Sequence, residues 1–361
     1  MRTLGQAFKQ KGREDSNNFL LLRLLAASLV VYGHSFALSA TTNGLRDFTT
    51  SILHYRYSGD LGLHIFFVIS GFLVTFSFDR RHSVKDFLIS RALRLFPALI
   101  VCMALLAFVL GPSLTTLTRG AYFQSSETYG FVWRNASLLE YAERLPGVFA
   151  NNHAPNAVDG TLWSIWVEAR LYVVVLVLGA LGALRSRWLS NVCIATLAVI
   201  GLIAPTYMPF ITADPSNLRV AVFFAAGAFL YVNRDFIPLN RQGLFALLLA
   251  AVLSYRQPAF EIACGAVIAY GVFVIAFAPK IHLRHIDDYS YGIYLYGWPI
   301  QQVVNHFYPG GSALQMMLVA LPGSWLAGAL SWHLVEKRAL RLKARYAGVK
   351  RAKSAGGVAL H

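Results

Sequence analysis

The sequence has few charged residues for its length. Of its 361 residues, 14% are Asp, Glu, Lys or Arg and 56% are hydrophobic, whereas ordinary soluble domains carry about 25% charged residues. Apolar stretches of about 20 residues, the length that spans a bilayer, recur along the chain, and no long polar segment separates them. The sequence therefore predicts an integral membrane protein that forms one polytopic unit without a separate soluble domain.

Cysteine is also scarce, and the common signatures of metal and nucleotide sites are missing. Cys102, Cys193 and Cys264 lie in apolar runs without CxxC spacing, so they predict neither a disulfide framework nor a zinc site. The chain contains no P-loop, no GxSxG and no HExxH motif. His282 and His285 share a short turn, but no neighbouring residue completes a metal site. We therefore expect no metal.

Negative charge is under-represented, and the net charge is +15. In a soluble protein this excess would suggest binding to nucleic acid, but membrane proteins collect Lys and Arg in their cytoplasmic loops. When the N-terminus is placed in the cytoplasm, most Lys and Arg residues fall in cytoplasmic segments. We therefore expect the lipid bilayer, and no nucleic acid, as a partner. The first apolar run contains Arg23 and lacks a small-residue cleavage site, so we expect a spanning helix rather than a signal peptide.

The predicted fold is an all-α membrane helix bundle of about ten transmembrane helices, with both termini in the cytoplasm. The transmembrane domain covers residues 1–345, and residues 346–361 form a basic tail that we expect to be disordered. An outer loop at about 113–160 is expected to serve binding, with a simple connector as the alternative. Its amphipathic stretch "SLLEYAERL" is expected to lie along the membrane surface. The expected spans are residues 19–38, 60–78, 95–112, 161–183, 189–210, 217–232, 243–256, 259–278, 288–307 and 313–335.

The run "RLLAASLVVYGH" holds two polar groups that lipid disfavours. Arg23 and His34 are eleven residues apart, close to three helical turns, so they face one side of a helix about 16 Å apart. An ionisable group at the bilayer centre costs about 2.5–3.5 kcal/mol or more, which favours a functional role. Arg23 would lie near the cytoplasmic face, and His34 deeper, where a neutral imidazole can act as a base. A His packed against a backbone carbonyl is the alternative for His34 taken alone.

Two neighbouring segments add small, hydroxyl and basic side chains. The stretch "GDLGLHIFFVISGFLVTFSF" contains glycines that let membrane helices approach closely, and Ser70, which can hydrogen-bond across helices. The stretch "SRALRLFP" places Arg91 and Arg94 at i,i+3 on one helix face. Paired arginines suit phosphate binding. Anchoring of lipid headgroups is the alternative for both residues.

The later spans contain one deep carboxylate and several aromatic side chains. Glu168 is the only carboxylate expected well inside the hydrocarbon, about 10 Å from the start of its helix, so it needs a partner. Candidates for that partner are Arg23, His34, Arg170 and Arg219. Trp163 fits an aromatic belt at the membrane interface. Tyr294, in "DDYSYGIYLYGWPIQ", brings a hydroxyl into a span, where it needs a hydrogen-bond partner. Glu336 is expected to pair with a neighbouring basic residue.

Taken together, these motifs resemble the acyltransferase-3 family of integral membrane acyltransferases over nearly the whole chain. The resemblance is carried by "RLLAASLVVYGH", "GLHIFFVISGFL", "SRALRLFP", "LWSIWVE" and "SYGIYLYGWP", in this order. The chain departs from the family at three places. His64 stands where many relatives have an acidic residue, Gly297 where many have a His, and Ala169-Arg170 where many have Glu-Gln.

The resemblance implies transfer of an acyl group, usually acetyl, from cytoplasmic acyl-CoA to a sugar hydroxyl at a bacterial inner membrane. Acyl-CoA would be a donor substrate, with no bound cofactor. The acceptor would be a glycan, glycolipid or polysaccharide, and glycan-assembly proteins would be possible partners. His34 would be a general base or an acyl carrier. The implied roles are catalysis for His34 and Glu168, acyl-CoA binding for Arg23, Arg91 and Arg94, and acceptor binding or support for Trp163, Ser70 and Tyr294.

A proton-coupled transporter or exporter of a sugar or lipid-linked substrate is the main alternative. Buried His, Arg and Glu side chains suit a proton relay equally well. The sequence shows neither internal repeats nor a matched pair of Gly/Pro-broken helices, which are typical of secondary transporters. A receptor or scaffold would not need charged residues at depth on several helices.

Overall fold

The structure, a computed structural model, describes residues 2–12, 16–39, 46–81, 83–208, 214–283 and 286–342. The predicted tail at 346–361 lies outside these residues. The described residues form helices and no strand, apart from two isolated bridges. The helices are α1 (Leu4–Lys11), α2 (Phe19–Leu38), α3 (Phe48–Ser51), α4 (Ser58–Arg81), α5 (Val84–Leu105), η2 (Leu106–Leu110), α6 (Gly111–Leu114), α7 (Arg119–Gln124), α8 (Ser126–Ser137), α9 (Leu162–Ala180), η3 (Ala183–Arg185), α10 (Arg187–Ile203), η4 (Pro205–Tyr207), α11 (Pro215–Val232), α12 (Arg241–Leu253), α13 (Phe260–Ala276), α14 (Ser290–Phe307), α15 (Ala313–Ser331) and η5 (Trp332–Glu336).

The all-α fold is thus confirmed, and the chain is a multi-pass membrane protein. In the described ranges, six helices are long and apolar enough to cross a membrane, and three shorter apolar helices accompany them. The six are Phe19–Leu38, Ser58–Arg80, Val84–Leu114, Leu162–Ala180, Pro215–Val232 and Ala313–Leu342. The total of ten spans and the cytoplasmic location of the termini stay predictions.

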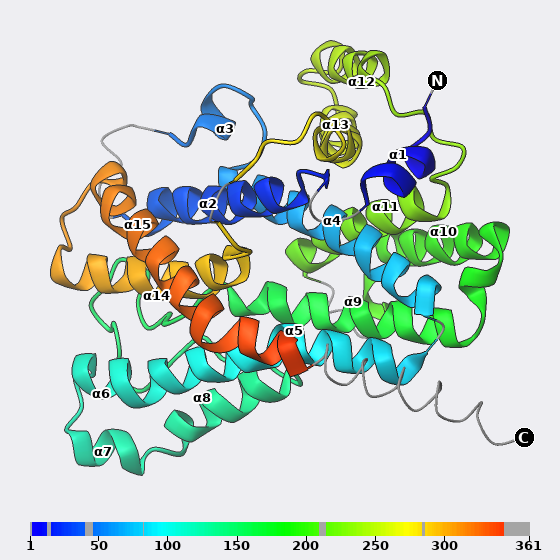
Figure 1. The fold of residues 1–361 in the computed structure, drawn as a ribbon. Helices are drawn as coiled ribbons and strands as arrows, with labels where there is room; N and C mark the ends of the chain where they lie inside the picture. Colours follow the sequence, from blue (N-terminus) through cyan, green and yellow to red (C-terminus); the bar gives the residue numbers. More distant parts are fainter. Residues whose placement is uncertain are drawn as a thin grey trace, which may run out of the picture.

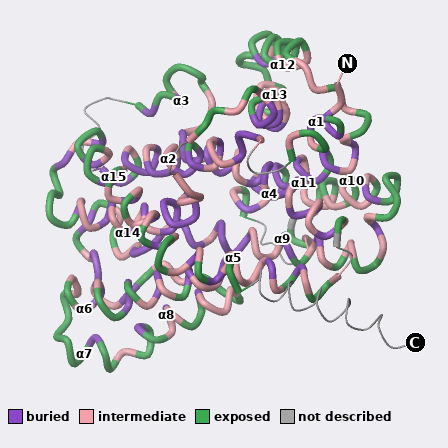
Figure 2. The backbone as a smooth tube through the Cα atoms, in the orientation of Figure 1, coloured by how far each residue is buried: buried purple, intermediate pink, exposed green. Residues whose placement is uncertain are grey.

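The bundle is built around α2, α4 and α14 (Figure 1). Buried residues gather on these helices, whereas α7 and α12 are largely exposed (Figure 2). Close packing at glycines confirms the role predicted for them. A Cβ atom at Gly62 would lie 2.5 Å from the carbonyl oxygen of Ala26, and one at Gly71 would overlap the carbonyl oxygen of Phe224. The backbones of α2, α4 and α11 are therefore in direct contact.

The third predicted span is part of a longer helix than expected. The prediction began the span at residue 95, but α5 already begins at Val84, because the side chain of Ser83 accepts a hydrogen bond from the backbone N–H of Asp86. The basic stretch that precedes the span is therefore helical and continuous with it. This continuity carries Arg91 and Arg94 into the bundle on α5.

The outer loop contains the stretch that was predicted to lie along the membrane surface. Its residues 138–145 are not helical, because α8 ends at Ser137 and Leu138 has a left-handed backbone, with a φ of 55°. The location of this stretch at the membrane surface stays a prediction. The side chain of Asn135 closes the turn through the backbone N–H and carbonyl of Ala142, each at 2.9 Å. The guanidinium of Arg170 on α9 donates to the carbonyl oxygens of Leu138 and Leu139 at 2.9 and 2.8 Å. The loop therefore folds back onto α9.

Candidate functional site

A cavity of about 120 Å³, partly open to the outside, lies among α2, α4, α5, α9 and α14. Its charged lining residues are Arg23, Arg91, Arg94 and Glu168. Hydroxyl groups from serines and tyrosines complete its polar lining. The predicted site residues that the structure brings together in this lining are Arg23, Ser70, Arg91, Arg94, Glu168 and Tyr294. The predicted residues that do not line it are His34 and Trp163.

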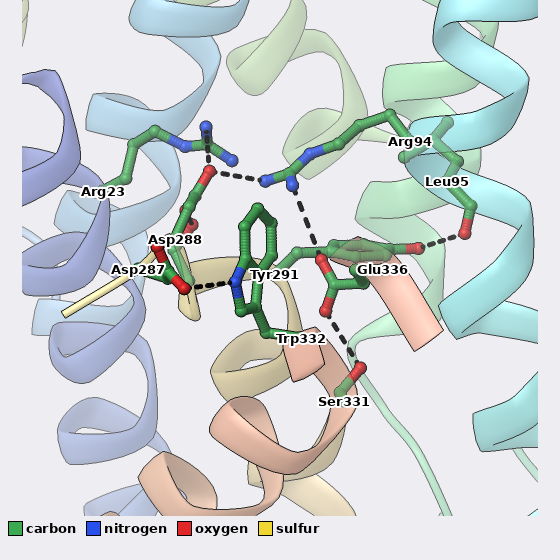
Figure 3. Close-up of polar contacts among 10 residues, drawn as sticks. Arg23, Arg94, Leu95, Asp287, Asp288, Tyr291, Ser331, Trp332 and Glu336 are labelled. Carbon is green, nitrogen blue, oxygen red and sulfur yellow. Dashed lines mark hydrogen bonds and ion pairs between the residues drawn. The ribbon is translucent and has the colours of Figure 1, made fainter. Parts of the chain in front are cut away.

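Two of the arginines share one carboxylate. The Oδ2 atom of Asp288, in the segment that leads into α14, lies 2.6 Å from Arg23 Nη1 and 3.0 Å from Arg94 Nη2 (Figure 3). Arg94 also contacts Glu336, with Nη1 3.5 Å from Oε2. Glu336 in turn accepts a hydrogen bond of 2.9 Å from the hydroxyl of Ser331. The expectation that Glu336 pairs with a neighbouring basic residue is wrong, because its cation comes from α5.

Arg91 differs from these two arginines, since no carboxylate of the described residues lies within ion-pair distance of it. Its guanidinium lies 5.5 Å from the ring centroid of Tyr172, and Nη2 is 3.5 Å from the hydroxyl of Ser90. Its Nε atom is buried without a hydrogen-bond partner in the described part of the chain. Arg91 is thus the cavity-lining cation whose charge is least compensated.

Glu168 binds hydroxyl groups rather than a cation. Its Oε1 atom accepts hydrogen bonds from Ser70 Oγ at 2.6 Å and from the hydroxyl of Tyr172 at 2.7 Å. Within the described ranges, none of the partners proposed for it forms an ion pair with it. Arg23 pairs with Asp288, Arg219 pairs with Asp60, and Arg170 binds the outer loop. Glu168 therefore fixes Ser70 and Tyr172 on the cavity wall.

His34 lies beyond the cavity on the same helix as Arg23. Its ring is 4.9 Å from the ring of Trp298, edge to face, and 6.2 Å from that of Tyr57. Its Nδ1 atom is buried and has no hydrogen-bond partner among the described residues. An unpaired nitrogen on a buried imidazole does not agree with the alternative of a His packed against a carbonyl through that atom.

Tyr294 lies at the cavity wall, one helical turn from Trp298. Its hydroxyl is 2.5 Å from Ser164 Oγ, and it also donates to the carbonyl oxygen of Thr161 at 3.3 Å. Trp163, by contrast, is partly buried and packs against the hydrophobic core. The structure therefore places Tyr294 on the cavity wall, on the same helix as the Trp298 ring that contacts His34, whereas Trp163 is not among the lining residues.

Three acidic residues near the site were not assigned to it from the sequence: Asp159, Asp288 and Glu336. The doublet at 287–288 stands directly before a span with several tyrosines, and this position is the one sequence signal that would have drawn attention to Asp288. The sequence offers Asp159 or Thr161 as a cap of α9, and the structure has Thr161 at the N-cap position, without a side-chain cap hydrogen bond. The Oδ1 atom of Asp159 accepts hydrogen bonds from the backbone N–H and the hydroxyl of Thr161, at 2.9 and 2.7 Å. Its Oδ2 atom is buried without a partner in the described residues.

Burial of Asp159, which precedes the spanning part of α9, raises the pKa of its carboxyl to about 7. The folded protein therefore holds this proton more tightly than the unfolded chain, whose Asp has a pKa of about 3.9. The stability contributed by the proton is complete below pH about 4 and is lost as the pH rises towards 7. We expect the midpoint of thermal unfolding in detergent to fall over this range, and to fall less in Asp159→Asn.

Asp214→Asn provides the control, because Asp214 likewise lies directly before a spanning helix, α11, and accepts backbone hydrogen bonds there, but it is exposed. Its pH profile should follow that of the unmodified protein. An Asp159→Asn variant whose unfolding midpoint has the same pH dependence as the unmodified protein would contradict the assignment of this proton to Asp159.

Comparison with known families identifies the chain. The sequence model of the acyltransferase domain that defines the acyltransferase-3 family matches residues 17–335. The chain belongs to the acyltransferase-3 family. The match includes all five helices that line the cavity, and it confirms the membership predicted from the motifs.

Similarity to named proteins supports O-acyltransferase activity for this family member. An O-acetyl transferase of Shigella phage Sf6 is 29% identical over 90% of this chain and 96% of its own length. Nodulation protein 10 of Rhizobium leguminosarum bv. viciae is 28% identical over 91% of this chain and 94% of its own length. A peptidoglycan O-acetyltransferase of Listeria monocytogenes is 28% identical over 67% of this chain and 45% of its own length. No solved structure matches the chain. Membership of the acyltransferase-3 family and these relatives together indicate a membrane acyltransferase.

Proposed function

We propose that this protein transfers an acyl group, such as acetyl, from cytoplasmic acyl-CoA to a hydroxyl of a sugar or glycan at the cell surface. The bacterial and phage relatives suggest a bacterial inner membrane as its location. The observation that carries the proposal is the cavity itself. It combines three arginines at one end with a carboxylate and several hydroxyls along its wall, and His34 lies beyond them on the helix of Arg23.

The arginine end suits the donor. Coenzyme A is a polyanion, and guanidinium groups bind phosphate through charge-assisted hydrogen bonds. Arg91 has no carboxylate partner among the described residues, so it meets a phosphate without first giving up an ion pair. The pantetheine arm would then extend along the cavity past Glu168 towards Tyr294, and would bring the thioester to the region of His34.

The chemistry assigned to His34 is proton transfer. As a general base, its imidazole takes the proton of the acceptor hydroxyl while the oxygen attacks the thioester carbonyl. The C–S bond then breaks, and the proton passes from the imidazolium to the thiolate of coenzyme A. In the alternative route, His34 carries the acyl group before it reaches the acceptor. Detection of an acetylated His34 by mass spectrometry after a rapid quench distinguishes the two routes.

Stabilisation of the oxyanion falls to Tyr294 rather than to Ser70 in this proposal. The hydroxyl proton of Ser70 is donated to Glu168, so it is not available to a tetrahedral intermediate. The hydroxyl of Tyr294 exchanges a hydrogen bond with Ser164, and either of the two oxygens can be the donor. When Ser164 is the donor, the proton of Tyr294 points to the carbonyl oxygen of Thr161 at 3.3 Å. In this proposal Tyr294 exchanges that long hydrogen bond for a stronger one to the oxyanion.

The test uses inverted membrane vesicles that contain or lack the protein, supplied with radiolabelled acetyl-CoA. We expect base-labile label in the glycan or glycolipid fraction only when the protein is present. Release of coenzyme A without an acceptor would report slow hydrolysis and would support the donor assignment. Absence of both products, together with accumulation of solute in the vesicles, would instead favour the transporter.

A further inference from the structure

We infer that Asp288 is a positioning residue that holds Arg23 and Arg94 at the cavity wall, where they meet the phosphates of the donor. This inference rests on the proposed function, since it concerns the binding of acyl-CoA to the same cavity.

Asp288 lies behind the arginines with respect to the cavity. Arg23 from α2 and Arg94 from α5 are both lining residues, whereas Asp288 is not. The two guanidiniums converge on a single oxygen, Oδ2 (Figure 3). The other oxygen, Oδ1, accepts a hydrogen bond of 2.6 Å from the hydroxyl of Ser290, the first residue of α14. One carboxylate therefore ties α2 and α5 to the start of α14.

The contacts leave most of each guanidinium free. A guanidinium has five N–H donors. Asp288 takes one from Arg23 and one from Arg94, and Glu336 takes a second from Arg94. The remaining donors are available to a ligand in the cavity. Since a long side chain loses considerable rotamer freedom on binding, an arginine that is already held in place binds a phosphate at a lower entropic cost.

The charges around Asp288 are paired. Its carboxylate lies between the guanidiniums of Arg23 and Arg94, at 2.6 and 3.0 Å. Asp288 and Glu336 thus balance Arg23 and Arg94, while Arg91 remains without a carboxylate among the described residues. Two of the three arginines, Arg23 and Arg94, are therefore held in place by carboxylates, whereas the positive charge of Arg91 is not paired with one.

The adjacent Asp287 provides a matched control. Its Oδ2 atom accepts hydrogen bonds from Trp332 Nε1 at 2.8 Å and Lys337 Nζ at 2.9 Å, and neither arginine contacts it. Asp287→Asn and Asp288→Asn change the net charge equally, one residue apart. Electrostatics alone predicts that each substitution strengthens the binding of a polyanion, because each removes a negative charge. If Asp288 acts by positioning the arginines, Asp288→Asn weakens the binding of a polyanion, and Asp287→Asn does not.

The experiment measures the affinity of coenzyme A for the purified full chain in detergent by calorimetry, at two salt concentrations. We expect Asp288→Asn to weaken binding by about 10-fold, and Asp287→Asn to leave it unchanged or slightly stronger. In an Arg94→Ala background, Asp288→Asn should have a much smaller effect, because the two residues act through one contact. If Asp288→Asn weakened binding only by disturbing the fold, the loss of affinity would be the same in the unmodified protein and in the Arg94→Ala variant.

Ser290→Ala keeps the test decisive if Asp288→Asn does not yield folded protein. It removes the hydrogen bond to Oδ1 without changing any charge, and it should weaken binding in the same direction but less. Binding by Asp288→Asn that equals or exceeds that of the unmodified protein would overturn the inference and leave the proposed function standing. Failure of the unmodified protein itself to bind coenzyme A would instead reject the proposed donor.

Discussion

Replacing His34 by alanine is expected to lower the rate of acyl transfer by about 10²- to 10⁴-fold, the usual contribution of a positioned general base. The affinity for coenzyme A should not change, because His34 does not line the arginine end of the cavity. The loss should therefore appear in kcat rather than in the donor KM. The measurement is steady-state transfer of radiolabelled acetyl groups by purified protein, together with calorimetry of donor binding.

His64→Ala is the control for this prediction. His64 is also a buried histidine on a spanning helix, with Nδ1 2.9 Å from the hydroxyl of Tyr55, but it does not line the cavity. Both substitutions remove a buried imidazole, so a general effect on packing would appear in both variants. Turnover by His34→Ala at the rate of His64→Ala would remove His34 from the mechanism.

Replacing Arg91 by alanine is expected to weaken the binding of coenzyme A by about 10- to 100-fold. A hydrogen bond to a charged group contributes about 1.5–3 kcal/mol, and each tenfold change in affinity corresponds to about 1.4 kcal/mol. Arg91 has no carboxylate partner in the described residues, so its removal leaves no buried anion behind. The fold should therefore tolerate the change, and the salt dependence of binding should decrease. Calorimetry over a range of salt concentrations measures both quantities.

Arg80→Ala tests the alternative of lipid-headgroup anchoring. Arg80 is exposed near the end of α4 and lies outside the cavity, so its loss should leave the affinity for coenzyme A unchanged. Should Arg91→Ala bind coenzyme A as tightly as Arg80→Ala does, Arg91 would be a headgroup anchor and not a donor-binding residue.

Much of the fold and part of the site could be predicted from local sequence patterns. The apolar runs predicted the helices, and the glycines of α4 predicted its close packing. The residues Arg23, Arg91, Arg94 and Glu168 were recognised by the cost of a charge in lipid or by their spacing, and the structure places all four on one cavity. Each of these predictions rests on residues of a single helix, where a charged residue in an apolar run or a helical spacing can be seen directly in the sequence.

The partners of these residues could not be predicted in the same way. Asp288 and Glu336 contact Arg94 across 194 and 242 residues of chain, and no local pattern selects one distant carboxylate over another. The course of the outer loop depends on a left-handed backbone at Leu138, a conformation that Leu does not favour. The hydroxyl partners of Glu168 were missed because a buried carboxylate was expected to require a cation.

The glycine contacts of α4 have a mechanical consequence. Gly62 and Gly71 bring the backbone of α4 against α2 and α11, so these three helices form a wall that cannot shift without separating main chains. Ser70, next to Gly71, holds Glu168 on the facing helix, α9. The link from this wall to α9 is a hydrogen bond between side chains, so we expect the widening that admits a bulky donor to take place on the side of α9 rather than within the wall.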